Sequence, residues 1–181
     1  MTPNASDRHL IPAWVDGELV PVEKLEAHRR GLRHPAISVF ILRGDETLLQ
    51  RRAHGKYHTP GLWANACCTH PHWGEAAPDC AARRLKEELG IIGLTLHPRG
   101  AVEYRADVGD GLIEHEQVDI FVAEAPRRLA LAPAIEEVAE VRWTRLDDLA
   151  AEIAAAPERF TPWLRIYMAE HGHQIFDRAV G

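Results

Sequence analysis

The sequence predicts an α+β fold, an α/β sandwich in which helices flank a mixed β-sheet. Short apolar runs of strand length recur along the 181 residues, and longer segments that suit helices lie between them. Glycine and proline residues divide these segments with turns and loops. The chain shows no internal repeat. Its length fits one domain, residues 1–181, that is large enough to bury a sizeable core.

The first third of the chain is predicted to consist mainly of strands. A hairpin is expected over residues 14–22, around an Asp-Gly turn, and a short helical piece over residues 22–30. Residues 36–42 form an apolar run that predicts a strand. After a tight turn, residues 47–52 are its expected antiparallel partner.

The rest of the chain is expected to alternate between helices and strands. Residues 76–89 suit a helix with acidic residues near its start, and Gly90 is placed to end it. Residues 124–133 are expected to form a loop. Further strands are predicted over residues 93–96, 102–106, 117–124 and 138–144, and the last helices over residues 146–155 and 162–171.

Composition narrows the class of protein. The 27 acidic and 21 basic residues give a net charge of -6, which argues against a general nucleic-acid surface. An anionic substrate therefore requires a local basic patch. Three cysteines, two of them adjacent, do not form a disulfide framework, and no apolar run approaches the roughly 20 residues of a membrane span. Residues 1–12 lack the apolar core of a secretory leader, so we expect a reduced, cytoplasmic enzyme.

Glu114 and Glu116 form one candidate chemical centre. Residues two apart in a strand point to the same face, and continuing this parity gives the apolar residues Val118 and Ile120. Burying an unpaired carboxylate is costly, so a regular strand here requires a cation or a raised proton affinity. The alternative is that the strand begins at Gln117 and both glutamates are solvated loop residues.

A second candidate centre combines a thiol, an imidazole and carboxylates. Cys68 stands two residues before His70, and the pair Glu87-Glu88 follows within a helical segment. A thiol can donate or accept a proton, and an imidazole can bind a metal. Glutamates in the helical segment also have a plain structural explanation, because arginines four residues earlier suit ion pairs worth about 0.2 to 0.5 kcal/mol each.

Residues 83–91 read Arg-Arg-Leu-Lys-Glu-Glu-Leu-Gly-Ile, with Glu75 before them. Together they resemble the Nudix box, in which a glutamate is followed by Arg-Glu-apolar-x-Glu-Glu-x-Gly-apolar. Thr69 stands where the box has its first glycine, and Arg84 stands where it has a metal-binding glutamate. The second difference argues against ordinary Nudix hydrolysis of diphosphates.

An altered box that follows an Asn-x-x-Cys-x-His-Pro segment, here residues 65–71, resembles the type I isopentenyl-diphosphate isomerases. This branch of the Nudix fold does not hydrolyse diphosphate. The resemblance extends over residues 24–163 and implies a Nudix-like mixed sheet flanked by helices. It also implies interconversion of isopentenyl and dimethylallyl diphosphate, which supplies the allylic primer for isoprenoid assembly.

The resemblance implies a metal site of three imidazoles and two carboxylates. Such a set suits octahedral Mn²⁺ or Mg²⁺, and imidazole also attracts Zn²⁺. A further Mg²⁺ is expected to bind with the substrate diphosphate near Glu88. The other histidines, His58 among them, are expected to be surface or hydrogen-bonded structural residues. The implied ligands of the first metal are His28, His34, His70, Glu114 and Glu116.

The resemblance also implies the groups that bind and convert the substrate. Moving the double bond requires protonation of the terminal alkene carbon and removal of a proton on the other side, with a cation-like state between. Cys68 and Glu116 are the implied proton-transfer groups, helped by Tyr104. The implied substrate-binding residues are Lys24, Arg52, Lys56 and Arg84 for the diphosphate and Trp163 for the cationic centre.

Two other functions compete with this interpretation. A Nudix pyrophosphohydrolase acting on a nucleoside diphosphate derivative requires a carboxylate at the position of Arg84. A non-catalytic Nudix-like module or a structural zinc protein is the other, but structural zinc sites are usually dominated by closely spaced cysteines. The partner expected in each enzymatic case is a small-molecule diphosphate, with no nucleic acid and no membrane. The sequence does not specify the oligomeric state.

Overall fold

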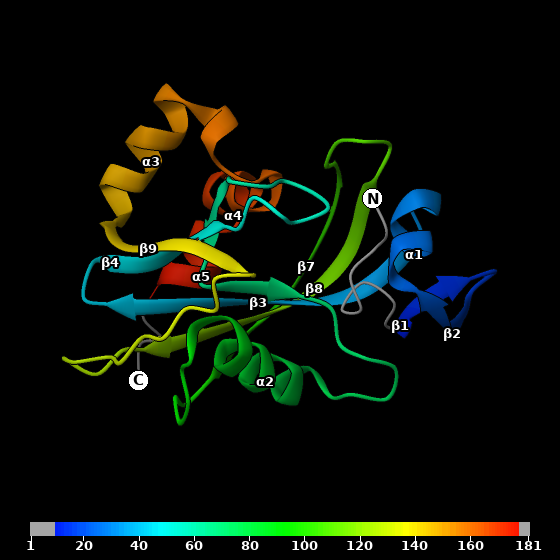
Figure 1. Ribbon diagram of the computed structural model, residues 1–181, viewed down its shortest axis with the longest axis horizontal. Coiled ribbons are helices and arrows are strands. Elements are labelled where there is room, and N and C mark those ends of the chain that lie inside the picture. Colours follow the sequence, from blue (N-terminus) through cyan, green and yellow to red (C-terminus); the bar gives the residue numbers. More distant parts are fainter. Residues whose placement is uncertain (1–9, 178–181) are drawn as a thin grey trace.

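The computed structural model describes residues 10–177 and has the expected α+β architecture. A seven-stranded mixed sheet forms the centre, with the strand order β5-β4-β3-β8-β7; β6 also pairs with β3, and β9 with β4. The helix α2 covers one face of this sheet, and α3, α4 and α5 lie on the other (Figure 1). The sheet strands are β3 (Arg33–Arg43), β4 (Glu46–Arg52), β5 (Trp63–Asn65), β6 (Cys67–Thr69), β7 (His97–Asp107), β8 (Ile113–Glu124) and β9 (Val138–Arg145).

A small hairpin and a short helix lie at one end of the sheet (Figure 1). The strands β1 (Leu10–Val15) and β2 (Glu18–Glu23) pair antiparallel and lead into α1 (Lys24–Arg30). Gly31 ends α1 in the left-handed conformation, with φ 59°, which a glycine adopts without strain. The remaining helices are α2 (Ala77–Leu89), α3 (Leu146–Ala155), the 3-10 turn Pro157–Arg159, α4 (Pro162–Glu170) and α5 (Gly172–Phe176).

The central strand β3 is buried on both faces, as expected for a strand covered by helices on each side. Ile37 and Val39 pack in the core beneath α2, together with Leu85 of that helix. Phe40 packs in the other core, against Tyr167 of α4, with the ring centroids 5.7 Å apart. The alternation of side chains along β3 therefore builds two separate cores.

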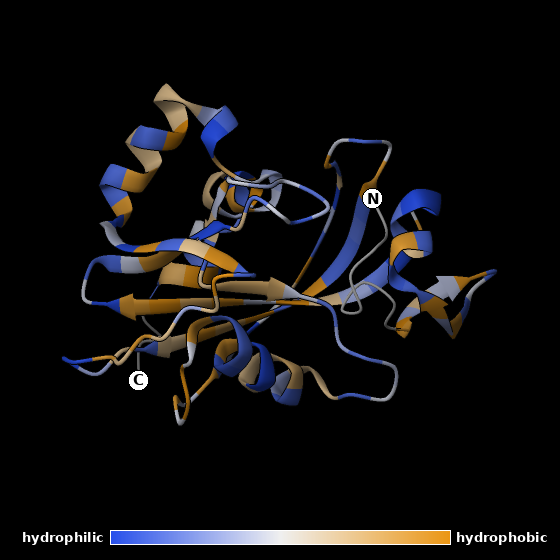
Figure 2. Cartoon of the chain, viewed as in Figure 1, coloured by the Kyte–Doolittle hydropathy of each residue, from blue (hydrophilic) through white to orange (hydrophobic). Residues whose placement is uncertain are grey.

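Strand pairing brings three polar residues into one row. β3 and β8 run parallel with His34 opposite Glu116, and β7 runs antiparallel to β8 with Tyr104 opposite Glu116. β8 changes from hydrophilic at its start to hydrophobic further along, so its polar part lies near α1 and its apolar part between the two cores (Figure 2). The row of polar residues thus forms at one end of the sheet.

Two strand predictions require correction. Residues 93–96 do not form a strand; Gly93 has φ 76°, and Leu94 and Leu96 pack against the α2 core from a loop. The strand predicted to begin at Gln117 begins at Ile113, so Glu114 and Glu116 belong to β8 and are buried. The solvated-loop alternative for these glutamates is therefore wrong.

The helix predictions hold, with shifts of a few residues at the ends. The helices α1, α2, α3 and α4 lie within the predicted segments, while α5 and the short strands β5 and β6 were not predicted. None of the helices in residues 10–177 has the length and apolar character to cross a membrane.

Candidate active site and metal centre

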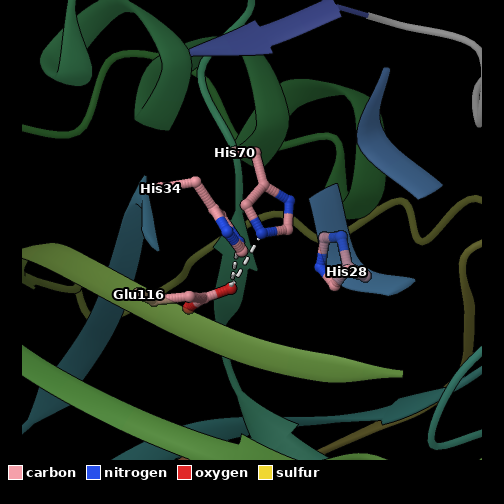
Figure 3. Close-up of side chains that lie close together, drawn as sticks. All are labelled: His28, His34, His70 and Glu116. Carbon is pink, nitrogen blue, oxygen red and sulfur yellow. Dashed lines mark hydrogen bonds and ion pairs between the residues drawn. The ribbon is translucent and has the colours of Figure 1, made fainter. Parts of the chain in front are cut away.

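Three imidazoles and a carboxylate meet at the polar end of the sheet. His28 comes from α1, His34 and Glu116 from the paired strands β3 and β8, and His70 follows β6 directly. His34 and His70 point toward Glu116, with His28 beside them (Figure 3). The Nε2 atoms of His70 and His34 lie 2.8 Å and 3.5 Å from Glu116 Oε1.

The donor atoms of these four residues all lie within 4.8 Å of one another, and all four side chains are buried. Opposite ligands of an octahedral ion with bonds of about 2.1 Å are about 4.2 Å apart. The cluster therefore has the dimensions of a divalent metal site. His28 lies in this cluster, as the resemblance implies.

Hydrogen bonds fix the tautomers of two histidines. His28 Nδ1 lies 2.7 Å from the carbonyl oxygen of Lys24, and His34 Nδ1 lies 2.7 Å from that of Leu32. A carbonyl oxygen only accepts, so each Nδ1 carries a proton, and in the neutral ring each Nε2 then carries a lone pair. Both Nε2 atoms are buried without a hydrogen-bond partner among the described residues. Two lone pairs next to a carboxylate call for a cation.

Burial keeps His28 and His70 neutral, which is the form that binds metals. Burial, together with His70 and His34, lowers the pKa of His28 to about 2. Burial lowers the pKa of His70 to about 4, although its hydrogen bond with Glu116 works in the opposite direction. At neutral pH neither ring competes for the site as a cation.

Glu114 and Tyr104 extend the cluster. The Tyr104 hydroxyl lies 2.9 Å from Glu114 Oε2 and 2.7 Å from Glu116 Oε2, and with one proton it donates to one carboxylate at a time. Burial and the charge of Glu116 raise the pKa of Glu114. Burial opposes ionisation of Glu116, but its contacts with His34 and His70 outweigh this and lower its pKa. The two carboxylates therefore differ in proton affinity.

His58 was expected to be an ordinary structural or surface histidine, but it lies in this site. Its side chain is buried, and its Nε2 atom lies 2.8 Å from Glu114 Oε1. His28, His58 and Glu114 form a second group whose ligand atoms are close enough to hold an ion. His58 belongs to the connection between β4 and β5, where no periodic pattern indicates which side chains point inward.

The two adjacent cysteines point to opposite faces of the sheet. Cys67 packs in the α2 core, and Cys68 lines a pocket on the other face together with Glu116 and Trp163. Burial raises the pKa of the Cys68 thiol, and the carboxylates of Glu116 and Glu114 raise it further. Cys68 is therefore a protonated thiol beside the carboxylate cluster.

The same pocket brings together the predicted basic residues. Arg52 lies over the ring of Trp163, with its guanidinium carbon 5.3 Å from the ring centroid. Lys56 forms an ion pair with Glu137, which also contacts Arg84 at 3.3 Å. The pocket is lined by Lys24, Arg52, Lys56, Tyr57, His58, Cys68, Thr69, His70, Arg84, Glu88, Glu114, Glu116 and Trp163.

Arg84 occupies the space beside Glu88. The Nη2 atom of Arg84 lies 2.6 Å from Glu88 Oε1, and Gln50 donates to Glu88 Oε2 at 2.8 Å. Glu75 is held in a similar way by Arg83, at 2.6 Å and 2.8 Å. The carboxylates of the helix segment are thus partly neutralised by its own arginines, in contrast to a box that binds metal through clustered glutamates.

Gly90 fixes how this helix ends. It has φ 67°, and a Cβ atom at this position would lie 2.7 Å from the Cβ of Ala132. Only glycine suits this position. It adopts the left-handed conformation without strain, and it has no side chain to collide with the nearby 132–134 segment. The glycine of the sequence motif therefore has a structural role.

Comparison with protein families assigns the class. The NUDIX domain model matches residues 32–164, so the chain belongs to the Nudix family. Among solved structures, DR0079 from Deinococcus radiodurans superposes with a TM-score of 0.69 at 14% identity, covering 88% of this chain and 96% of that one. A MutT protein from Methanosarcina mazei superposes with a TM-score of 0.59 at 18% identity, covering 75% and 90%. These likenesses show the fold.

Curated relatives define the branch. The isopentenyl-diphosphate Delta-isomerase of Cereibacter sphaeroides strain ATCC 17025 is 69% identical over 93% of this chain and 96% of its own length. The enzymes of the same name from Dinoroseobacter shibae and Rhodobacter capsulatus are 66% and 65% identical, over 93% and 92% of this chain and 96% and 95% of their own lengths. The chain belongs to the isopentenyl-diphosphate Delta-isomerase family.

Proposed function

We propose that this protein converts isopentenyl diphosphate to dimethylallyl diphosphate by protonation and deprotonation of the carbon skeleton. The observation that carries the proposal is the shared pocket of Cys68 and Glu116, lined also by Trp163 and by basic side chains. The Cys68 thiol keeps its proton, whereas the Glu116 carboxylate binds a proton weakly. The two groups therefore differ in their tendency to donate or accept a proton. The family relationship supports this chemistry.

The reaction requires two proton transfers. One group gives a proton to the terminal alkene carbon, which leaves a tertiary cation-like centre, and the other removes a proton from the neighbouring methylene. The electrons of that C–H bond become the new double bond, so the diphosphate stays attached throughout. Cys68 and Glu116 are the proposed groups, and Tyr104 passes a proton to or from the Glu116 carboxylate through its 2.7 Å contact.

Trp163 and the basic residues act on different ends of the substrate. A tryptophan ring facing the cation-like centre contributes about 0.5 to 2 kcal/mol of attraction, and its buried position excludes water. Arg52, Lys24, Lys56 and Arg84 provide the positive charge that the diphosphate requires.

Divalent ions complete the proposed site. His28, His34, His70, Glu114 and Glu116 are the proposed ligands of Mn²⁺ or Mg²⁺, with Zn²⁺ as a competitor for the imidazoles. When bound, this ion neutralises the buried carboxylates and fixes their geometry. Glu88 is the proposed contact of a further Mg²⁺ that arrives with the substrate diphosphate. Metal analysis of the purified protein distinguishes among these ions.

The hydrolase alternative lacks the residue it needs. A Nudix pyrophosphohydrolase requires a carboxylate where this chain has Arg84, and that arginine is paired with Glu88. The structural zinc alternative also fits poorly, because the clustered ligands are histidines and glutamates rather than cysteines. The proposal treats residues 1–181 as one catalytic domain in the reducing cytoplasm, which suits three free thiols.

Proton NMR in deuterated water tests the proposal directly. The purified protein is incubated with isopentenyl diphosphate, Mg²⁺ and Mn²⁺, and phosphate release is followed in the same tube. We expect deuterium-labelled dimethylallyl diphosphate and no phosphate. Phosphate release from a nucleotide panel without an allylic product would favour the hydrolase.

A matched pair of variants tests the assignment of the thiol. Cys68→Ala is expected to abolish turnover while metal and substrate binding persist, because the thiol transfers a proton but binds neither the metal nor the substrate. Cys67→Ala alters the opposite, α2-facing core, so it is expected to keep the activity. Full activity of Cys68→Ala would overturn the proposed mechanism.

A further inference from the structure

His58 lies between a proposed diphosphate-binding residue and a proposed metal ligand. Its Nε2 atom is 2.8 Å from Glu114 Oε1, and its Nδ1 atom is 3.2 Å from Arg52 Nη2. The Tyr57 ring stacks on the imidazole, with the centroids 4.3 Å apart and the planes 13° from parallel. Both ring nitrogens are therefore engaged, and the ring is held in one orientation.

The contacts determine where the proton of His58 lies. An arginine guanidinium only donates hydrogen bonds, so the nitrogen that faces Arg52, Nδ1, must accept. A buried neutral imidazole has one N–H, which leaves the proton on Nε2. His58 therefore donates to the Glu114 carboxylate. This is the opposite tautomer to His28 and His34, whose Nδ1 atoms face backbone carbonyls.

This tautomer separates His58 from the metal ligands. A ligand nitrogen presents a lone pair, and the nitrogen of His58 near Glu114 presents a hydrogen. His28 and His34 instead direct unpartnered Nε2 lone pairs into the site. By distance alone, His58 groups with His28 and Glu114. Its hydrogen bonds instead indicate a residue that does not bind the metal itself but orients a ligand that does.

The backbone next to His58 is held in an unfavourable conformation. Thr59 has φ 45°, in the left-handed region that a β-branched residue rarely adopts, and its side chain is buried. Such a conformation costs about 1 to 3 kcal/mol and persists only where surrounding contacts impose it. Here the Tyr57 stack and the two polar contacts of the imidazole are contacts of this kind.

We propose that His58 is a positioning residue that orients the Glu114 carboxylate for the metal and links it to Arg52. The chain of contacts runs from Arg52 through His58 to Glu114, and from there through Tyr104 to Glu116. Movement of Arg52 onto a diphosphate thus removes the donor that His58 Nδ1 accepts from and, through His58, changes the support of a metal ligand. This inference rests on the proposed metal site and adds a coupling between the metal ligands and the diphosphate-binding residues.

Two substitutions separate the contacts of His58. In His58→Gln the amide nitrogen takes the place of Nε2 and keeps a donor for Glu114. In His58→Asn the carbonyl oxygen takes the place of Nδ1 and keeps an acceptor for Arg52, but the donor for Glu114 is lost. His54, an exposed histidine in the same connection, supplies the matched controls His54→Gln and His54→Asn.

The test measures Mn²⁺ binding to the metal-stripped full-length protein by electron paramagnetic resonance, without substrate. We expect His58→Asn to weaken binding by about 10-fold or more, the effect typical of losing an outer contact of a ligand, and His58→Gln to restore most of it. Both His54 variants should bind as the wild type does. Nitrogen-15 NMR of the histidines should show the proton of His58 on Nε2 in the unsubstituted protein.

The outcomes distinguish this inference from the proposed function. Equal loss in the Gln and Asn variants would make His58 a ligand or a packing residue, and no loss in His58→Asn would leave it without a role at the metal; either overturns the inference. A proton on Nδ1 of His58 also overturns it. Failure of the wild type itself to bind Mn²⁺ would overturn the proposed metal site, and this inference with it.

Discussion

The carboxylates at helix α2, one just before it and one within it, contact a different kind of partner from those of strand β8. Glu75 and Glu88 are each contacted by an arginine of the helix, Arg83 or Arg84. Glu114 and Glu116 are instead contacted by imidazoles and by the Tyr104 hydroxyl. A carboxylate beside an arginine is already neutralised, whereas one beside neutral imidazoles still calls for a cation.

This difference shows how one fold can relocate its chemistry. In the Nudix box pattern the helix carries a cluster of metal-binding carboxylates. Here Arg84 replaces one of them and pairs with Glu88, so the helix holds no such cluster, and Glu88 is left as the proposed contact of the Mg²⁺ that comes with the substrate. The buried carboxylates that call for a cation are instead those of β8, Glu114 and Glu116.

Glu116→Gln is expected to reduce kcat by about 10³-fold or more, because Glu116 is the proposed proton-transfer group and a proposed metal ligand. Glu87→Gln on α2, which removes only exposed ion pairs with Arg83 and Arg84, should change kcat less than about fivefold. Steady-state kinetics with isopentenyl diphosphate measures both. Similar losses in the two variants would break the distinction between the two sets of carboxylates.

Arg84→Glu should return the demand for a cation to α2. The variant removes the 2.6 Å contact with Glu88 and adds a negative charge, so we expect a loss of about 3 kcal/mol in unfolding free energy. Millimolar Mg²⁺ should recover much of that loss, because clustered carboxylates bind the ion. Urea unfolding with EDTA and with Mg²⁺ provides the comparison. A variant no more sensitive to Mg²⁺ than the wild type would contradict this explanation.

Metal removal should affect the segments that carry the proposed histidine ligands and leave α2 unchanged. At a Mn²⁺ concentration of 100 times its Kd, binding adds about 2.7 kcal/mol to the unfolding free energy, which EDTA removes. Hydrogen exchange should slow on metal binding in residues 20–35, which contain His28 and His34, with little change in residues 77–89. Unchanged exchange in residues 20–35 would count against histidine ligation from α1 and β3.

Glu75→Gln should have a small and pH-dependent effect. The hydrogen bonds from Arg83 hold the pKa of Glu75 at about 2, below the usual 4.5, so its stabilising effect is complete above pH 4.5 and is lost as the pH falls toward 2. We expect the variant to lose about 1 to 2 kcal/mol at pH 7 and less at pH 3. Urea unfolding at the two pH values measures the difference. A constant difference would show that the charge of Glu75 is not responsible.

Much of the fold and the cluster could be predicted from periodicity and motif spacing. The parity of β8 placed Glu114 and Glu116 on one face, and the structure shows the strand that makes this parity hold. Pairing of β3 with β6 and β8 brings together the segments that supply His34, His70 and Glu116, and helix α1 places His28 beside them; no local pattern specifies either arrangement. Their grouping was inferred from resemblance, and the structure provides the geometry.

The failures have local physical causes. Residues 93–96 have alternating apolar side chains, but Gly93 adopts a positive φ and the following leucines pack without a strand partner. His58 lies in an irregular connection, where side-chain direction depends on tertiary contacts with Tyr57 and Arg52. An irregular segment gives no period from which to infer an inward direction, so this residue could not be found from sequence.

The row formed by His34, Glu116 and Tyr104 has a consequence for folding. Side chains alternate along a strand, so a slip of one residue between β3 and β8 would turn His34 or Glu116 to the opposite face. An ion that requires both ligands stabilises only the correctly aligned sheet. The proposed metal centre would then favour correct strand alignment, because chains that pair in the wrong register would gain no stability from the ion.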